Sequence, residues 1–140
     1  MAPDATTNDS TAETGVSIGE ASARTGVSAD ALRYYERIGV LAPVPRDAGG
    51  RRRYDAATIG MIDFVRRLRS TGMGVEDVAA YAGLVRRGEG TVAERRAVLE
   101  RHRDHVAAQV EALAEVLSVL DRKIGHYADV EKGAALDCDD

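Results

Sequence analysis

A chain of 140 residues is long enough for one domain of ordinary size, or for a small domain followed by an extended helix. Its hydrophobic content of 44% includes one Phe and no Trp, so a core of Leu, Val, Ile and Ala is expected, which suits helices better than a β-sandwich. The single Cys138 excludes an internal disulfide and fits a reducing, cytoplasmic compartment. No run approaches the roughly 18 apolar residues of a membrane span, and the N-terminus lacks a secretory signal.

The net charge of −4 hides a segregation of charge along the chain. Residues 16–74 contain ten Arg and six acidic residues, whereas residues 1–15 and 75–140 are acidic. Arg suits bidentate contacts with phosphate and guanine better than Lys does. A basic block inside an acidic chain is a local electrostatic footprint, and it favours a nucleic-acid partner.

Residues 1–15 are polar and mildly acidic, and we expect them to form a disordered N-terminal tail. The next stretch has the pattern of two short helices joined by a tight turn. Ser17 and Ser28 are each suited to cap a helix, and Gly26 can take the positive φ of the corner between them. Gly39 is placed to end the second helix. Two short helices with a glycine between them are typical of a helix-turn-helix, whose second helix enters the major groove of DNA.

Residues 41–54 predict a short β-hairpin, which we call the wing. Two prolines favour extended backbone in its first half, and Asp47-Ala-Gly-Gly50 has the composition of a turn. Arg46 lies on one side of this turn and Arg51–Arg53 lie on the other. The wing therefore adds to the basic block beside the helix pair.

Asp55 can cap a third helix that ends at Thr71-Gly72, and a fourth helix is predicted from about Val75 to Arg87. Gly88-Glu89-Gly90 then breaks the helical pattern. We expect residues 16–88 to form a winged helix-turn-helix DNA-binding domain. The apolar residues that recur at helical spacing in the third helix are Ile59, Ile62, Val65 and Leu68.

Thr91 and Glu94 form a predicted capping box that opens the longest helical pattern of the chain. Apolar residues then keep a seven-residue repeat, which predicts a coiled-coil dimerisation helix over residues 91–127. A helix of this length is best buried against a second copy of itself, because the remaining body is small. Residues 128–140 are treated as a C-terminal tail. The expected interface residues are Leu99, Val106, Val110, Leu113, Leu117, Leu120 and Ile124.

These features together resemble the MerR family of bacterial transcription regulators over residues 16–124. The resemblance rests on R-Y-Y-E followed by G-x-L-x-P, and on the R-x-Y that closes the wing ahead of Asp55. It implies a mainly α fold, in which a winged helix-turn-helix domain with a small β-hairpin wing precedes a long helix. It also implies a homodimer joined by an antiparallel coiled coil. Such a dimer would bind a pseudo-palindromic promoter and distort it for RNA polymerase in response to an effector.

The resemblance also assigns roles to individual residues. Arg33 and Tyr34 match the positions that contact the major groove, and Tyr35 is divided between core packing and backbone contact. Arg51 and Arg52 match wing positions that contact phosphates, as does Tyr54, which also suits an anchoring role in packing. Ser28 can meet a phosphate or a base edge. The complete set of expected DNA-binding residues is Ser28, Arg33, Tyr34, Tyr35, Arg37, Arg46, Arg51, Arg52, Arg53 and Tyr54.

The effector half of the chain matches the family less well. Metal-responding members carry paired cysteines after the long helix, whereas this chain has Cys138 alone, flanked by acidic residues that blunt its reactivity. His102 and His105 lack an evident third ligand, so we expect neither a metal nor a cofactor. The 16 residues after Ile124 are too few for a large sensor domain. A compact regulator that responds to a small-molecule or stress signal, or to none, is expected.

An enzyme is not expected, because the sequence offers no convincing nucleophile–base pair, phosphate loop or carboxylate pair. Two alternatives stay open. A related regulator could block a promoter without distorting it. A helical adaptor could instead bind a protein partner through the coiled coil, with the basic block playing no part.

Overall fold

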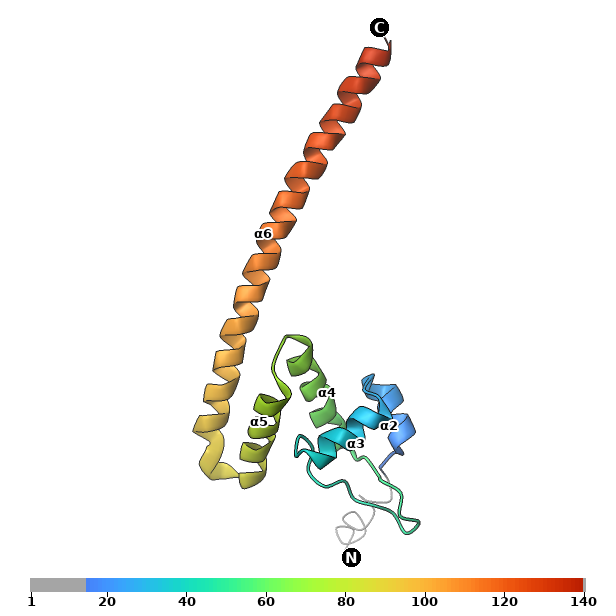
Figure 1. Cartoon of the computed structure of the whole chain (residues 1–140), viewed down its shortest axis with the longest axis vertical. Helices are drawn as coiled ribbons and strands as arrows, with labels where there is room; N and C mark the ends of the chain where they lie inside the picture. Colours follow the sequence, from blue (N-terminus) through green and yellow to red (C-terminus); the bar gives the residue numbers. More distant parts are fainter. Residues whose placement is uncertain (1–14, 140) are drawn as a thin grey trace, which may run out of the picture. The chain divides into compact units, whose positions relative to one another are not determined.

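The computed structural model describes residues 15–139, and it describes their side chains as far as residue 134. This part of the chain is mainly helical, and it divides between Val98 and Leu99 into two compact units. The expected disordered tail lies outside the described residues except for Gly15, which is buried. The elements are α2 (Ile18–Thr25), α3 (Ala29–Arg37), α4 (Ala56–Ser70), α5 (Val75–Arg87), the 3-10 turn η1 (Glu89–Thr91) and α6 (Val92–Asp139) (Figure 1).

The predicted helix-turn-helix is confirmed, and its ends are capped as the sequence suggests. The Ser17 and Ser28 hydroxyls each accept a hydrogen bond from the backbone amide three residues on, at 3.2 and 3.1 Å. Gly26 has φ 76° in the corner between α2 and α3, and Gly39 has φ 86° just after α3. Both glycines adopt the left-handed backbone that L side chains disfavour.

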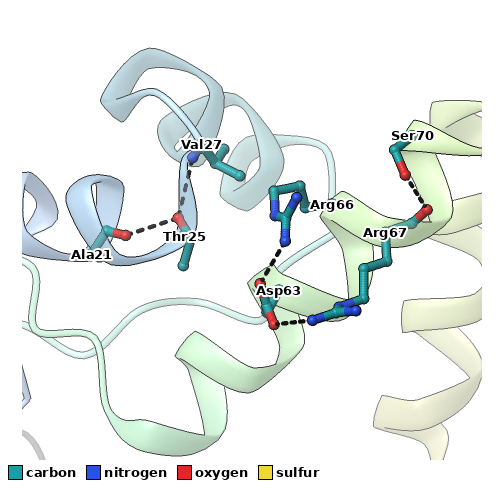
Figure 2. A network of polar contacts seen from close by, with 7 residues as sticks. All are labelled: Ala21, Thr25, Val27, Asp63, Arg66, Arg67 and Ser70. Atoms are coloured by element: carbon teal, nitrogen blue, oxygen red, sulfur yellow. Dashed lines mark hydrogen bonds and ion pairs between the residues drawn. The ribbon is translucent and has the colours of Figure 1, made fainter.

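Thr25 holds the corner of the helix-turn-helix from inside (Figure 2). Its hydroxyl donates to the Ala21 carbonyl at 2.8 Å and accepts from the Val27 amide at 3.2 Å. The side chain is buried, so both bonds are shielded from water. The hydroxyl therefore ties the last turn of α2 to the segment that enters α3.

A core of aliphatic residues joins α2, α3, α4 and the wing. α2 packs on both α3 and α4, and α4 packs on α5. Three of the four apolar α4 residues predicted from the helical repeat are buried, and the fourth is half-buried. The buried cluster consists of Ala21, Val27, Leu32, Leu41, Val44, Tyr54 and Ile62.

The wing is a narrow hairpin held by isolated bridges. Arg46 pairs with Arg52 across the turn in an antiparallel bridge. A second bridge joins Val16 to Tyr54, with both backbone hydrogen bonds at 2.8 Å. The segment that precedes α2 therefore lines the second arm of the wing, a pairing that the sequence did not predict.

The connection into α6 differs from the expected capping box. α5 has the predicted bounds, but Thr91 lies in η1 and is buried. Its hydroxyl lies 2.6 Å from the carbonyl oxygens of both Leu84 and Gly88, and it accepts from the Arg95 Nε at 3.1 Å. The threonine side chain therefore fastens η1 to the end of α5 instead of capping the long helix.

α6 is longer than predicted. It contains 48 residues, which corresponds to about 72 Å at the usual rise per residue. The region assigned to the C-terminal tail, residues 128–140, is helical as far as Asp139. None of the described helices is long and apolar enough to cross a membrane.

Candidate nucleic-acid interface

Ser28, the N-cap of α3, and Arg33, in the second turn of the helix, both lie on the surface. Ser28 is exposed and its oxygen already accepts the capping bond, so its hydroxyl proton can still be donated to a ligand. Arg33 Nη1 lies 2.9 Å from Asp30 Oδ1. The Asp30 side chain is 98% exposed, so water and salt screen this pair strongly. Arg33 can therefore exchange Asp30 for a phosphate or a base at little cost.

Tyr34 and Arg37 are also exposed on α3. Tyr34 is 41% exposed, and the Arg37 guanidinium carbon lies 5.5 Å from the centroid of its ring. This is the distance of a cation–π contact, which restrains both side chains. The adjacent Tyr35 is half-buried and packs against the core cluster. The structure thus presents Tyr34 outward and uses most of Tyr35 for packing.

The turn of the wing is organised by Asp47. Its Oδ1 accepts from the amides of Gly49 and Arg51, both at 3.0 Å, and Gly50 has φ 80°. Arg46 Nη1 donates to the Gly50 carbonyl at 2.9 Å while the side chain stays exposed. The tip of the wing therefore has a fixed shape and carries exposed cations.

The three consecutive arginines of the wing have three different environments. Arg51 is exposed, and within the described residues its guanidinium has no hydrogen bond or ion pair. Arg52 Nε lies 2.6 Å from Glu36 Oε1 on α3. Arg53 Nη2 donates to the Gly15 carbonyl. Arg52 and Arg53 are therefore held by acceptors of the chain itself, and DNA contact by all three arginines stays a prediction.

Tyr54 is part of the core, where it has the anchoring position that the sequence also suggested for it. The residue is 1% exposed, so its ring has no surface to offer to a ligand. Burial raises the pKa of its hydroxyl, the nearby Glu36 adds to that effect, and the charges of Arg52, Arg33 and Arg46 oppose it. These three arginines come from α3 and from both arms of the wing. The contact of 2.6 Å between Arg52 and Glu36 places α3 and the wing beside each other.

Glu36 links α3 to the wing, a contact that the sequence did not predict. Burial raises the pKa of its carboxyl. Hydrogen bonds from Arg52 and from the Val44 amide, together with the charges of Arg52 and Arg46, outweigh burial and lower the pKa below its ordinary value. The same pair raises the pKa of Arg52. One signal was available in the sequence. Residues alternate sides in an extended arm, so Arg52 shares a side with the core residue Tyr54 and not with Arg51.

Arginines of α4 are also engaged within the chain. Asp63 contacts both Arg66 and Arg67, at 3.3 and 3.5 Å, as Figure 2 shows. Arg69 Nη1 donates to the Met73 carbonyl at 3.1 Å at the end of the helix. The basic block that the sequence revealed is therefore only partly available to a ligand. Arg66, Arg67 and Arg69 still lie on the surface, so its accessible portion consists of these side chains and the exposed cations of α3 and the wing.

α6 carries the second candidate surface. Leu99 and Val106 are half-buried, whereas the remaining expected interface residues are 49–65% exposed. Val116 and Val119 add to the exposed apolar surface of this helix. A row of large apolar side chains in water is typical of an interaction surface. The residues concerned are Val110, Leu113, Leu117, Leu120 and Ile124.

Metal-ligating side chains do not gather in the described part of the chain. No group of three or more His, Cys, Asp or Glu residues there has the arrangement of a metal site. The rings of His102 and His105 have centroids 5.9 Å apart. Cys138 lies beyond the last described side chain, so the expectation for its thiol falls outside the described residues.

A helix-turn-helix joined to a narrow wing, with exposed cations on both, defines a winged helix-turn-helix DNA-binding protein. Comparison with known families identifies the class more closely. A family described as "MerR HTH family regulatory protein" matches residues 16–83, and one described as "MerR, DNA binding" matches residues 61–123. The chain belongs to the MerR family of transcription regulators, and it is a DNA-binding regulator.

Two curated relatives give the extent of the similarity. An uncharacterized HTH-type transcriptional regulator of Haemophilus influenzae is 31% identical over 108 residues, which cover 77% of this chain and 80% of that protein. The heavy metal-dependent transcription regulator 2 of Rhizobium meliloti is 32% identical over 111 residues, covering 79% and 76%. The predicted family is thereby confirmed.

Among solved structures, the chain is similar to HiNmlR, a MerR family regulator lacking the sensor domain and bound to promoter DNA. The TM-score is 0.74 at 29% sequence identity, and the match covers 82% of this chain and 91% of that chain. The predicted fold class is confirmed by this likeness and by the helical architecture.

Proposed function

We propose that the protein is a homodimeric regulator that binds a pseudo-palindromic promoter and alters transcription by distorting the DNA. The observation that carries this proposal is the pair of exposed cationic elements, α3 and the wing, that the contacts of Glu36 hold beside each other in a chain of net charge −4. The local positive surface attracts DNA, and the acidic remainder of the protein repels it.

Within this proposal, α3 enters the major groove with Arg33 and Tyr34 facing the base edges. Arg37 restrains the Tyr34 ring from one side. Arg46 and Arg51 contact phosphates from the wing, where their guanidinium groups are exposed. Ser28 contributes its hydroxyl at the N-terminus of α3, where anions are favoured. Arg52, Arg53 and Tyr54 support the wing from within.

The proposed dimer uses the apolar row of α6. Two copies of a helix with a seven-residue apolar repeat bury their rows against each other in a coiled coil. The exposure of Leu113 and Leu117, both above 60%, supports a second copy as the partner. A symmetric dimer would present two α3 helices, which matches a pseudo-palindromic site.

Distortion of the DNA between the two half-sites is the proposed means of regulation. Bending or untwisting DNA costs free energy that depends on its sequence, so it also contributes to specificity. In this proposal RNA polymerase transcribes from the distorted promoter, and a small-molecule or stress signal controls the distortion. Membership of the family supports each of these steps.

The test is fluorescence anisotropy with a duplex from the upstream region of the gene, titrated at several salt concentrations beside a scrambled duplex. We expect tight binding with a large preference for the native duplex. Equal and weak binding to both duplexes at moderate salt would instead favour the adaptor, whose partner is a protein. The proposed distortion brings the −35 and −10 elements of a promoter with an overlong spacer into line for RNA polymerase. Transcription in vitro from a variant promoter with a shorter spacer between these elements tests it separately, since that promoter should work without the regulator.

A further inference from the structure

The carboxylate of Glu36 joins three segments of the DNA-binding unit. Glu36 lies in α3, and its Oε1 lies 2.6 Å from Arg52 Nε in the second arm of the wing. Its Oε2 accepts from the Val44 amide at 3.0 Å, in the first arm of the wing. Both oxygens of one side chain are therefore used to hold the wing against α3.

This contact differs from the ion pairs on the surface of the helices. Arg24–Glu20 and Arg33–Asp30 join residues three or four apart on one helix, with side chains about half exposed or more. Such pairs contribute little to tertiary structure. The Arg52 and Glu36 side chains are only 25% and 18% exposed, and the residues are 16 apart in sequence. Their pairing therefore constrains how two elements sit relative to each other.

The backbone of the wing makes few contacts that could fix its direction relative to α3. One isolated bridge, Arg46 with Arg52, closes the hairpin, and a second fixes the base of its second arm at Tyr54. A hairpin with so few backbone contacts is marginal by itself. The direction of the wing must then be set by side chains, namely by the buried Tyr54 and by the Glu36–Arg52 contact.

We propose that Glu36 is a positioning residue for DNA recognition, and that Arg52 serves to hold Glu36 rather than to contact a phosphate. This inference rests on the proposed function, in which α3 and the wing engage the same duplex at once. With the contact in place, Arg46 and Arg51 are held in register with Arg33 before DNA arrives. Without it, the wing must be ordered during binding, and the ordering entropy weakens the complex.

The sign of the effect separates this proposal from simple electrostatics. Glu36→Gln removes a negative charge beside the cationic surface, so charge alone would strengthen DNA binding. The positioning role predicts the opposite result. We expect affinity for the native duplex to fall about tenfold, the size of one charged hydrogen bond. Preference over the scrambled duplex should fall with it.

Salt dependence separates positioning from phosphate contact. Each lost phosphate contact lowers the slope of log K against log salt by about 0.9. Since the bound complex keeps the same phosphate contacts, Glu36→Gln and Arg52→Gln should weaken binding with the slope unchanged. The double variant should be no weaker than either single variant, because both remove the same contact. Arg52→Lys, which keeps the charge but not the planar guanidinium, should weaken binding in the same direction.

A second measurement follows the wing in the protein without DNA. The Arg53 amide donates to the Pro45 carbonyl and the Asp47 amide donates to the Arg51 carbonyl, at 2.8 and 2.9 Å. Hydrogen exchange at these two amides should be faster in Glu36→Gln than in the wild type, while the Val78 amide inside α5 should exchange as before. This readout does not depend on any duplex. If Glu36→Gln does not fold, Arg52→Lys replaces it in both experiments.

Three results would overturn the proposal. They are unchanged or tighter binding by Glu36→Gln, a slope that falls by about 0.9 per protomer in Arg52→Gln, and wing amides whose exchange is unaffected. Failure of the proposed function has a different signature, because the wild type itself would then bind the native and scrambled duplexes equally.

Discussion

Gly15 lies against the backbone of Tyr54 so closely that no side chain fits between them. A Cβ on Gly15 would lie 2.9 Å from both the carbonyl carbon and the carbonyl oxygen of Tyr54. The neighbouring Val16 forms the two backbone hydrogen bonds that fix the base of the wing. We expect Gly15→Ala to lower the free energy of unfolding by about 1–3 kcal/mol, because the backbone must shift to relieve the contact. Thermal denaturation measures this loss.

Gly19→Ala is the matched control for that substitution. Gly19 lies in α2, and a Cβ there would meet only the Ser17 hydroxyl oxygen at 3.9 Å. Alanine is the better helix former by roughly 0.5–1 kcal/mol, so this variant should be slightly more stable than the wild type. Equal melting temperatures for the two variants would contradict the tight packing of Gly15.

Thr25→Val tests the corner of the helix-turn-helix. The substitution keeps the shape of the side chain but removes the hydroxyl that accepts from the buried Val27 amide. An unpaired buried amide costs about 1–3 kcal/mol, and chemical denaturation should detect that loss. Thr25→Ser keeps the hydroxyl and should retain most of the stability. A valine variant as stable as the serine variant would show that the hydroxyl is dispensable.

Arg51→Ala tests the proposed phosphate contact of the wing. Because this guanidinium is exposed, its loss should weaken binding to native and scrambled duplexes alike. The slope of log K against log salt should fall by about 0.9 for each protomer bound. Arg122→Ala makes the same change of charge on α6 and should leave the slope as it is. Identical slopes for the wild type and Arg51→Ala would remove Arg51 from the interface.

The lowered pKa of Glu36 makes the stability of the domain dependent on pH. A carboxyl whose pKa is lower in the folded than in the unfolded state stabilises the fold at pH values above its ordinary value of 4.5. That stabilisation is lost as the pH falls below 4.5 and through the lowered value. Between neutral pH and this acidic range, the wild type should lose more unfolding free energy than Glu36→Gln. Parallel stability curves for the two proteins would show that Glu36 is not held in its ionised form.

Leu113→Asp tests the proposed dimer. A charge in the centre of an apolar interface is costly to bury, so the variant should sediment as a monomer and lose tight binding to DNA. Ser118→Asp adds the same charge roughly 140° around the helix and should leave the dimer intact. A Leu113→Asp variant that remains dimeric would place the interface elsewhere.

Local features of the fold could be predicted from the sequence because their causes are local. The caps at Ser17, Ser28 and Asp55 act on amides three residues away, so a short stretch of sequence specifies them. The bounds of α5 follow from the helical repeat and from Gly88. The end of α6 was misplaced, since the apolar repeat fades before the helix itself ends at Asp139.

The architecture of the candidate site was predicted less well because it depends on contacts between distant residues. Gly15 and Tyr54 are 39 positions apart, and nothing in either local sequence indicates the other. A count of charges does not distinguish Arg51, Arg52 and Arg53. Of these three, only the Arg51 guanidinium has no hydrogen bond or ion pair in the described structure. Tyr54 must be buried, and side chains alternate along an extended arm. The burial of Tyr54 therefore decides which of the arginines faces outward.

The bonds that anchor the wing also determine which piece of this regulator can be transplanted. A graft of α2 and α3 alone would carry Glu36 without Arg52 and would leave the new host to orient the recognition helix. The smallest segment that keeps both ends of the Val16–Tyr54 bridge, and also the α4 residues that complete the core, runs from residue 15 to residue 70. Chimeras designed to redirect this protein to another promoter should therefore exchange that whole segment. Within it, the residues that anchor the wing should be kept and the exposed side chains of α3 varied.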